Sequence, residues 1–312
     1  MTVRKRMIPN NIKKEPMPGA TEKEYIYFTV KFNRFRDVSG STANEVLDKE
    51  EFSECDCVLR LPESYTDTGE ETPLILSFHG AGSTVSEADN MIGGIPYAAE
   101  CIKAGYAALD ISGAEPHGCT MGCPEHLFAA YKAYRYAIKH FNLSERVLLT
   151  GGSMGGQVAI NFANMFPGIV IAMGICIPRL NIDGVTVGEH YCIGTWDKTT
   201  PNAKGISTRD KIIDVYRLQG NEWDERNTVG FNPYKIRSFI NSEGKRVTFP
   251  PCPIKIWQGM EDKTVDPVMI EEFTASVRRG GCYIETHMLE GVGHALTDVM
   301  KKELLMWFNR FI

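Results

Sequence analysis

Short runs of apolar residues alternate with amphipathic segments along most of the chain after about residue 73. Apolar runs bounded by polar segments are typical of buried strands, and strands that alternate with helices predict βαβ units around a parallel sheet. These runs cover residues 74–78, 106–111, 146–150, 169–177, 253–258 and 283–289. Two earlier segments, 25–33 and 56–61, are rich in β-branched and aromatic residues and predict two more strands. The pattern therefore predicts an α/β protein.

Helical periodicity lies between these runs. Within residues 127–141, apolar side chains recur on one helical face: Leu127, Ala130, Tyr131, Tyr134, Ile138 and Phe141. Asp266 and Pro267 predict a helix start, with the aspartate as cap and the proline at the first helical position. The closing segment, through Ile312, is also predicted to be helical.

The predicted elements group into one domain, over residues 23–312, behind a flexible basic tail at 1–22. This tail lacks the apolar stretch of a secretory signal peptide. Residues 178–250 form a long irregular zone between two core strands. Such a segment within a compact domain is usually functional, so we expect a lid or a substrate-binding insertion.

Composition narrows the class of protein. The 312 residues are 43% hydrophobic and 23% charged, as in ordinary globular proteins, and the net charge of -5 gives no reason to expect a nucleic-acid partner. No apolar run is long enough to span a bilayer. Nine cysteines, an odd number, favour a reducing compartment. We expect a cytoplasmic protein without a membrane partner, while secretion and a homo-oligomer both stay open.

The strongest chemical signal is RVLLTGGSMGGQVAINFA, at residues 146–163, where a buried strand enters Gly151-Gly152-Ser153-Met154-Gly155 and then a helix. This is the G-x-S-x-G pattern in a strand–turn–helix setting. A serine on so tight a turn brings the residues two before and two after it together, so only small residues fit there. Ser153 is the candidate nucleophile.

A serine hydroxyl needs a base within hydrogen-bond reach. His294 follows the last predicted strand, between glycines that allow a sharp loop, and is the candidate base. Asp262, after the 253–258 strand, is the candidate acid that orients it. Glu261 and Asp266 are its neighbours, and Asp183 is a less favoured alternative acid.

Acyl transfer also requires donors for an oxyanion. The strand at 74–78 ends in His79-Gly80-Ala81-Gly82, whose small residues let backbone N–H groups approach a carbonyl. We assign the two donors to the amides of Met154 and Ala81, with Gly82 in reserve. His79 is expected to fix the loop rather than to take part in the chemistry.

These segments together resemble the α/β-hydrolase superfamily over about residues 55–312, and the chain order Ser, Asp, His is the order of that superfamily. GGSMGG, HGAG and GVGH look like esterases related to feruloyl esterases, acetyl xylan esterases and polyester depolymerases. They are also similar to the catalytic domain of prolyl oligopeptidase relatives. The resemblance implies a mostly parallel eight-stranded sheet, no cofactor, and an acetyl or feruloyl ester on a carbohydrate as substrate.

Several alternatives stay open. HGCTMGCPEH, at 117–126, could ligate zinc, although a Cys119–Cys123 disulfide or a plain loop fits its spacing better. His126 lies where it could touch substrate, and the aromatic side chains of the 178–250 zone, Tyr191, Trp196 and Trp223, could stack on a sugar or merely anchor the loop. The chain could also be a prolyl-oligopeptidase-like peptidase, or a small-molecule receptor on a hydrolase scaffold.

Overall fold

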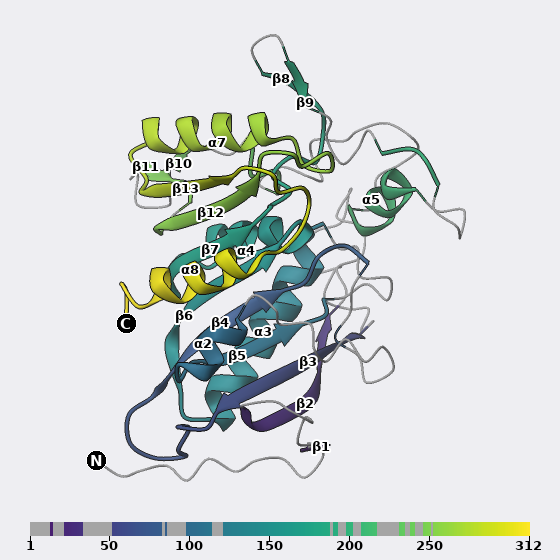
Figure 1. The fold of residues 1–312 in the computed structure, drawn as a ribbon. Coiled ribbons are helices and arrows are strands. Elements are labelled where there is room, and N and C mark those ends of the chain that lie inside the picture. The colour runs from purple at the N-terminus through teal and green to yellow at the C-terminus, as the bar shows by residue number, and fades with distance from the viewer. Residues whose placement is uncertain are drawn as a thin grey trace.

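The apolar runs assemble into one twisted sheet. The computed structural model describes residues 13–14, 22–33, 52–82, 85, 98–113, 121–187, 190–192, 198–201, 207–216, 231–234, 238–240, 246–250 and 252–312. Within this part of the chain, nine strands lie in the order β1-β2-β3-β5-β4-β6-β7-β12-β13 (Figure 1). They are β1 (Lys13–Lys14), β2 (Glu22–Asn33), β3 (Phe52–Pro62), β4 (Thr72–Phe78), β5 (Ala107–Ile111), β6 (Leu143–Gly152), β7 (Val170–Cys176), β12 (Ile254–Gly259) and β13 (Ile284–Leu289).

The six strands from β5 to β13 are mutually parallel, while β1, β2 and β3 pair antiparallel at the other edge. The eight predicted strands are all present, which confirms the mostly parallel α/β sheet. The tail prediction needs one correction, because Lys13 and Lys14 pair with Tyr27 and Ile26 of β2. The carboxyl ends of the parallel strands β4, β6, β12 and β13 lie at the same end of the sheet, which is where α/β proteins place their ligand-binding and active sites.

Helices cover both faces of the sheet (Figure 1). They are α2 (Ala99–Lys103), α3 (Pro124–His140), α4 (Met154–Met165), α7 (Pro267–Arg279) and α8 (Asp298–Phe308). As predicted, Asp266 caps α7, since its Oδ1 accepts a hydrogen bond from the Val268 amide at 3.0 Å. None of the helices in the described ranges is long and apolar enough to cross a membrane.

The 178–250 zone is described only in pieces. They include the hairpin β8 (Val185–Val187) and β9 (His190–Cys192), the helix α5 (Thr208–Tyr216), and the hairpin β10 (Ser238–Ile240) and β11 (Arg246–Thr248). Figure 1 shows the β8–β9 hairpin standing away from the central sheet.

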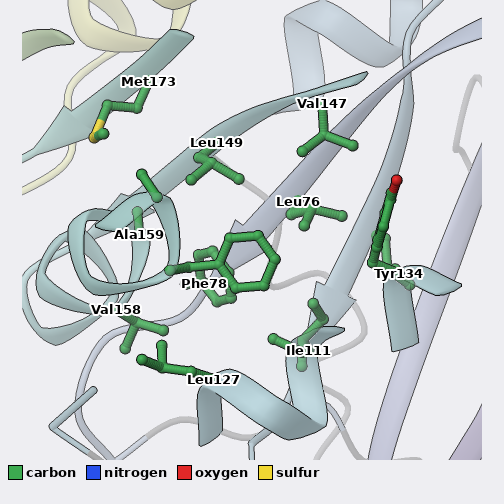
Figure 2. Close-up of a cluster of buried hydrophobic side chains, with 14 of the residues drawn as sticks. Leu76, Phe78, Ile111, Leu127, Tyr134, Val147, Leu149, Val158, Ala159 and Met173 are labelled. Atoms are coloured by element: carbon green, nitrogen blue, oxygen red, sulfur yellow. The ribbon is translucent and has the colours of Figure 1, made fainter. Parts of the chain in front are cut away.

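Alternation along the strands divides the core into two layers. Leu76 and Phe78 of β4 pack with Leu127 of α3 and Val158 of α4 on one face (Figure 2), while Ile75 points into the opposite layer. That second layer is built from α2 and α8 and includes Trp257, Leu304 and Trp307. Because both faces are buried, the strands read as continuous apolar runs rather than as alternating ones.

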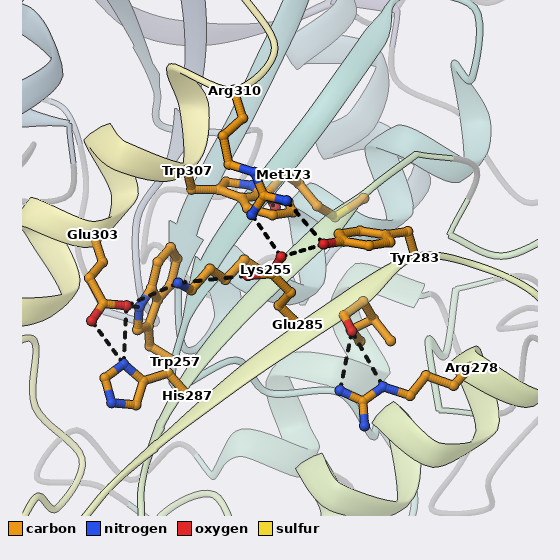
Figure 3. A network of polar contacts seen from close by, with 11 residues as sticks. Met173, Lys255, Trp257, Arg278, Tyr283, Glu285, His287, Glu303, Trp307 and Arg310 are labelled. Atoms are coloured by element: carbon orange, nitrogen blue, oxygen red, sulfur yellow. Dashed lines mark hydrogen bonds and ion pairs between the residues drawn. The ribbon is translucent and has the colours of Figure 1, made fainter.

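A polar network joins α8 to the β13 edge of the sheet (Figure 3). Glu303 of α8 accepts a hydrogen bond from Trp257 Nε1 at 2.8 Å and lies 3.0 Å from both Lys255 Nζ and His287 Nδ1. Nearby, Arg310 lies over the ring of Trp307, with its Cζ 4.6 Å from the ring centroid. This network holds the last helix beside the loop that carries His294.

Candidate active site

Ser153 occupies a strained turn between β6 and α4. Its φ of +53° is rare for a residue with a side chain, and such a backbone costs on the order of 1–3 kcal/mol. The Ser153 amide donates to the Cys176 carbonyl at 3.1 Å, and the Arg179 amide donates to the Ser153 carbonyl at 2.9 Å, so β7 holds the turn. A Cβ on Gly151 would lie 2.5 Å from the Gly155 carbonyl oxygen, which explains the need for glycine there.

The Ser153 hydroxyl faces the His294 ring. Ser153 Oγ lies 3.1 Å from His294 Nε2, and His294 Nδ1 lies 2.8 Å from Asp262 Oδ2. A ring that donates its Nδ1 hydrogen to the carboxylate leaves Nε2 to accept the serine proton, and this geometry sets the tautomer. The hydroxyl makes no helix-capping hydrogen bond to α4, so it is directed to the histidine.

The His294 loop packs on the turn that carries Asp262. Gly291 adopts a φ of +70°, and the Glu261 amide donates to the Val292 carbonyl at 2.9 Å. A Cβ on Gly259 would collide with the carbonyls of Val292 and the residue after it. The close approach of these two loops is what sets the distance between the ring and the carboxylate.

Asp262 is buried and receives donors on both oxygens. Its Oδ1 accepts from the amides of Thr264 and Val265 at 2.8 and 2.9 Å, and its Oδ2 accepts from Gln258 Nε2 at 3.0 Å in addition to His294. Burial alone would raise the pKa of the carboxyl. The hydrogen bonds outweigh burial and hold the pKa of Asp262 below its usual value, so the carboxylate is ionised beside the histidine.

The other candidate acids, Glu261, Asp266 and Asp183, lie in surroundings that differ from those of Asp262. Glu261 is exposed, and Asp266 caps α7. Asp183 accepts a hydrogen bond through its Oδ1 from Asn232 Nδ2 at 2.8 Å. Among the acids that the sequence analysis considered, Asp262 is the one that the described structure brings to His294.

The loop after β4 approaches the serine from the other side. A Cβ on Gly80 would lie 3.8 Å from Ser153 Cβ, and Ala81 and Gly82 are both exposed at the next positions. Met154 begins α4, so its amide lies at the positive end of the helix dipole. The candidate oxyanion donors thus flank the serine from two separate elements.

His79 ties this loop to the end of β5. Its Nδ1 lies 2.8 Å from the Gly80 carbonyl oxygen and its Nε2 lies 2.8 Å from the Ser112 carbonyl oxygen. The Ser112 hydroxyl in turn accepts a hydrogen bond from the Val85 amide at 2.6 Å. Both ring nitrogens of His79 lie within hydrogen-bond distance of backbone carbonyl oxygens, in keeping with a role in fixing the loop.

Comparisons with known proteins were made with the sequence and with the structure. No protein-family model and no curated protein matches the sequence. The structure is similar to an S-formylglutathione hydrolase from Agrobacterium tumefaciens, with a TM-score of 0.61, 13% identity, and coverage of 96% of this chain and 98% of that one. The chain has the α/β-hydrolase fold.

Two further structures share this hydrolase fold. Esterase 2 of Thermogutta terrifontis, phosphonylated by sarin, has a TM-score of 0.55 at 15% identity, over 82% of this chain and 88% of that one. A puromycin-hydrolyzing peptidase of Mycobacterium tuberculosis has a TM-score of 0.56 at 14% identity, over 83% of this chain but 38% of that one. At these identities the likeness establishes the fold.

The remaining residues that were predicted to contact a substrate do not all lie near Ser153 or within the described part of the chain. His126 is fully buried, edge-on to Phe78, and burial lowers its pKa to about 3. The structure therefore places this neutral ring in the core rather than where a substrate could reach it. Tyr191 belongs to β9, in which only the backbone is described, and Trp196 and Trp223 lie outside the described residues.

The 117–126 cluster is only partly described. Cys123 is a free thiol, and burial raises its pKa to about 12, which disfavours the thiolate that a metal requires. His117 and Cys119 lie outside the described residues. Within the described part of the chain, no group of three or more metal-binding side chains comes together.

Sequence reasoning missed a set of buried polar side chains on α4, the helix that follows Ser153. Gln157 Nε2 and the Tyr216 hydroxyl both donate to the Met121 carbonyl, at 2.8 and 2.7 Å. Asn161 Nδ2 donates to the Phe231 carbonyl at 2.9 Å. These contacts join α4 to the turn before α3 and to the 178–250 zone. Their one signal in the sequence is that Gln157 and Asn161 lie four residues apart on a mostly apolar helix.

Proposed function

We propose that this protein is a serine hydrolase that cleaves carboxylic esters through an acyl-enzyme. The observation that carries the proposal is the chain of contacts from Ser153 Oγ to His294 Nε2, and from His294 Nδ1 to Asp262 Oδ2, at the strand ends of an α/β-hydrolase fold. These distances are those of a nucleophile, its base and an orienting acid.

In the first half of the reaction, Ser153 Oγ attacks the ester carbonyl and its proton passes to His294 Nε2. The amides of Met154 and Ala81 hold the oxyanion, and each such donor is worth about 3 kcal/mol of transition-state stabilisation. Asp262 stabilises the imidazolium. The tetrahedral intermediate then collapses, the carbon–oxygen bond to the alcohol breaks, and the alcohol leaves with the proton from His294.

In the second half, water replaces the alcohol. His294 takes a proton from the water, the resulting hydroxide attacks the acyl carbonyl, and the second tetrahedral intermediate expels Ser153 Oγ. His294 returns its proton to the serine, and the carboxylic acid is released. The chain's own residues complete this cycle, so the mechanism calls for no cofactor.

The narrower part of the proposal concerns the substrate. The motifs GGSMGG, HGAG and GVGH favour an acetyl or feruloyl ester on a carbohydrate, on the resemblance given above. The neighbours in the structural comparison include an S-formylglutathione hydrolase and an esterase, so thioesters and simple alkyl esters are the competing substrate classes.

The test is hydrolysis of p-nitrophenyl acetate by the wild type and by Ser153→Ala, followed by acetylated and feruloylated oligosaccharides. We expect turnover that falls at least about 1,000-fold in the variant, since the nucleophile is lost. Turnover that survives the substitution would contradict the nucleophile. Activity on simple esters without release of acetate or ferulate from any saccharide would defeat the carbohydrate assignment alone.

A further inference from the structure

Gln258 is the last polar residue of β12 before the turn that carries Asp262. Its side chain is fully buried, and its Nε2 lies 3.0 Å from Asp262 Oδ2 and 3.2 Å from the carbonyl oxygens of both Gly259 and Val265. Three oxygen acceptors converge on this one group. The amide orientation is therefore fixed, because a flipped amide would set Oε1 against all three oxygens.

The position of this contact matters because Asp262 Oδ2 is also the oxygen that faces His294 Nδ1, at 2.8 Å. Gln258 and His294 therefore share one carboxylate oxygen, while the Thr264 and Val265 amides bind the other. A donor on the shared oxygen withdraws part of its negative charge from the histidine and holds the carboxylate plane toward the ring.

We propose that Gln258 is a positioning residue of the reaction, which orients Asp262 and moderates the hold of its carboxylate on the His294 imidazolium. This inference rests on the proposed function. Gln258 does not touch substrate or the reacting atoms, and acts through Asp262. Without it, the carboxylate is freer to turn, and its undivided charge stabilises the imidazolium more strongly, which makes the histidine a poorer acid toward the leaving alcohol.

The other ionisable groups of these loops should have little influence on the effect of Gln258 on His294. Glu261 and Lys263 on the Asp262 turn and Glu290 on the His294 loop are exposed, where solvent screens them. Asp266 is committed to the cap of α7. Arg179 follows β7, and its backbone amide donates to the Ser153 carbonyl.

The first variant is Gln258→Met, which keeps the length of the side chain and removes the donor. We expect kcat/KM to fall about tenfold. We also expect the acidic limb of the profile of kcat/KM against pH to move to higher pH by about half a unit to one unit, because the imidazolium is stabilised more strongly. The same displacement should appear when the His294 ring is titrated by NMR, a measurement that requires no substrate.

The second variant, Gln258→Glu, keeps the shape of the side chain and replaces its amide by a carboxyl group that can donate a hydrogen bond only while it is protonated. A protonated glutamic acid can still donate to Asp262 Oδ2, whereas an ionised one repels it. We expect turnover close to wild type at the acidic end and a steep loss as pH rises. An ionised glutamate in this buried position would also destabilise the fold, so unfolding is followed over the same pH range, and a loss of turnover in a variant that remains folded supports the positioning role.

The matched control is Thr274→Val on α7, which also replaces a buried polar side chain by an apolar one. It should leave both the acidic limb and the His294 titration in place. Unchanged limbs in both Gln258 variants, or an equal displacement in Thr274→Val, would overturn the inference. The failure of the proposed function would appear instead as turnover that survives Ser153→Ala. The NMR titration of His294 would still decide the role of Gln258.

Discussion

Ser153 is held in its strained conformation by hydrogen bonds to the neighbouring strand, so its geometry exists before any substrate binds. The Cys176 carbonyl and the Arg179 amide bind it from both sides of the turn. Strain of this kind persists only where the surroundings over-determine the backbone. At the residue scale, the fold sets the direction of the hydroxyl, and the contact with Asp262 sets the tautomer of His294, the proposed base.

Asp262 and Asp183 provide a direct comparison at this scale. Asp262→Asn should lower kcat on the order of 1,000- to 10,000-fold, because an amide facing His294 Nδ1 favours the wrong tautomer. Asp183→Asn should stay within about threefold of the wild type, because Asp183 binds Asn232 instead of the histidine. Steady-state kinetics on p-nitrophenyl acetate measure both. A large loss in Asp183→Asn with little loss in Asp262→Asn would exchange their roles.

At the scale of elements, α4 packs directly on the end of β4. A Cβ on Gly155 of α4 would collide with the backbone carbonyls of Phe78 and His79, which cannot move without shifting the strand. The glycine two positions after the serine therefore serves the approach of helix to strand as well as the turn. It also keeps the loop that carries Ala81 next to the serine.

Gly155→Ala should therefore destabilise the protein by about 3 kcal/mol, in the manner of an overpacked core. Gly168→Ala is the matched control, because a Cβ there would meet no atom within 4 Å. Urea unfolding followed by circular dichroism measures the difference. Equal midpoints for the two variants would show that α4 and β4 are less tightly packed than the structure indicates.

The elements were largely predictable because a strand that is covered on both faces must be a continuous apolar run. Each of the eight predicted runs became a strand, within a few residues at either end. The short strand β1 and the five-residue helix α2 carry too few residues for any periodicity. α3 buries Leu127, Ala130, Tyr134 and Ile138 of the predicted apolar face, and the helix begins three residues before Leu127, at Pro124.

The candidate site was predictable where its chemistry is tied to a turn motif, as for Ser153 and the glycines beside it. Gln258, Gln157 and Asn161 were not, because a buried amide is defined by the backbone oxygens that it meets, and these come from distant segments. His126 was placed at the site because it follows a core strand. Its side chain instead turns inward, against Phe78.

At the scale of the whole molecule, the network around Glu303 connects α8 to the edge of the sheet (Figure 3). Burial opposes the charged form, but hydrogen bonds from Trp257, His287 and Lys255 outweigh it and lower the pKa of Glu303 to about 2. A carboxyl with a depressed folded pKa stabilises the fold above its unfolded pKa of about 4.5. That contribution is lost as pH falls toward about 2.

Glu303→Gln should thus cost about 1–2 kcal/mol of unfolding free energy at pH 7. The difference from the wild type should shrink as pH falls from about 4.5 toward about 2, where the wild-type carboxyl is itself protonated. Glu272→Gln, at an exposed position on α7, is the control and should change little at either pH. Urea unfolding across this pH range measures the effect, and a cost that does not vary with pH would contradict the assignment.

Covalent labelling tests whether Ser153 is a nucleophile that His294 activates. The wild type, Ser153→Ala and His294→Ala would each be treated with a fluorophosphonate, and the adduct would be located by peptide mass spectrometry. We predict one adduct, on Ser153, in the wild type, none on Ser153→Ala, and labelling slowed at least about 100-fold in His294→Ala. An unlabelled wild type, or an adduct on another residue, would show that Ser153 is not the activated nucleophile.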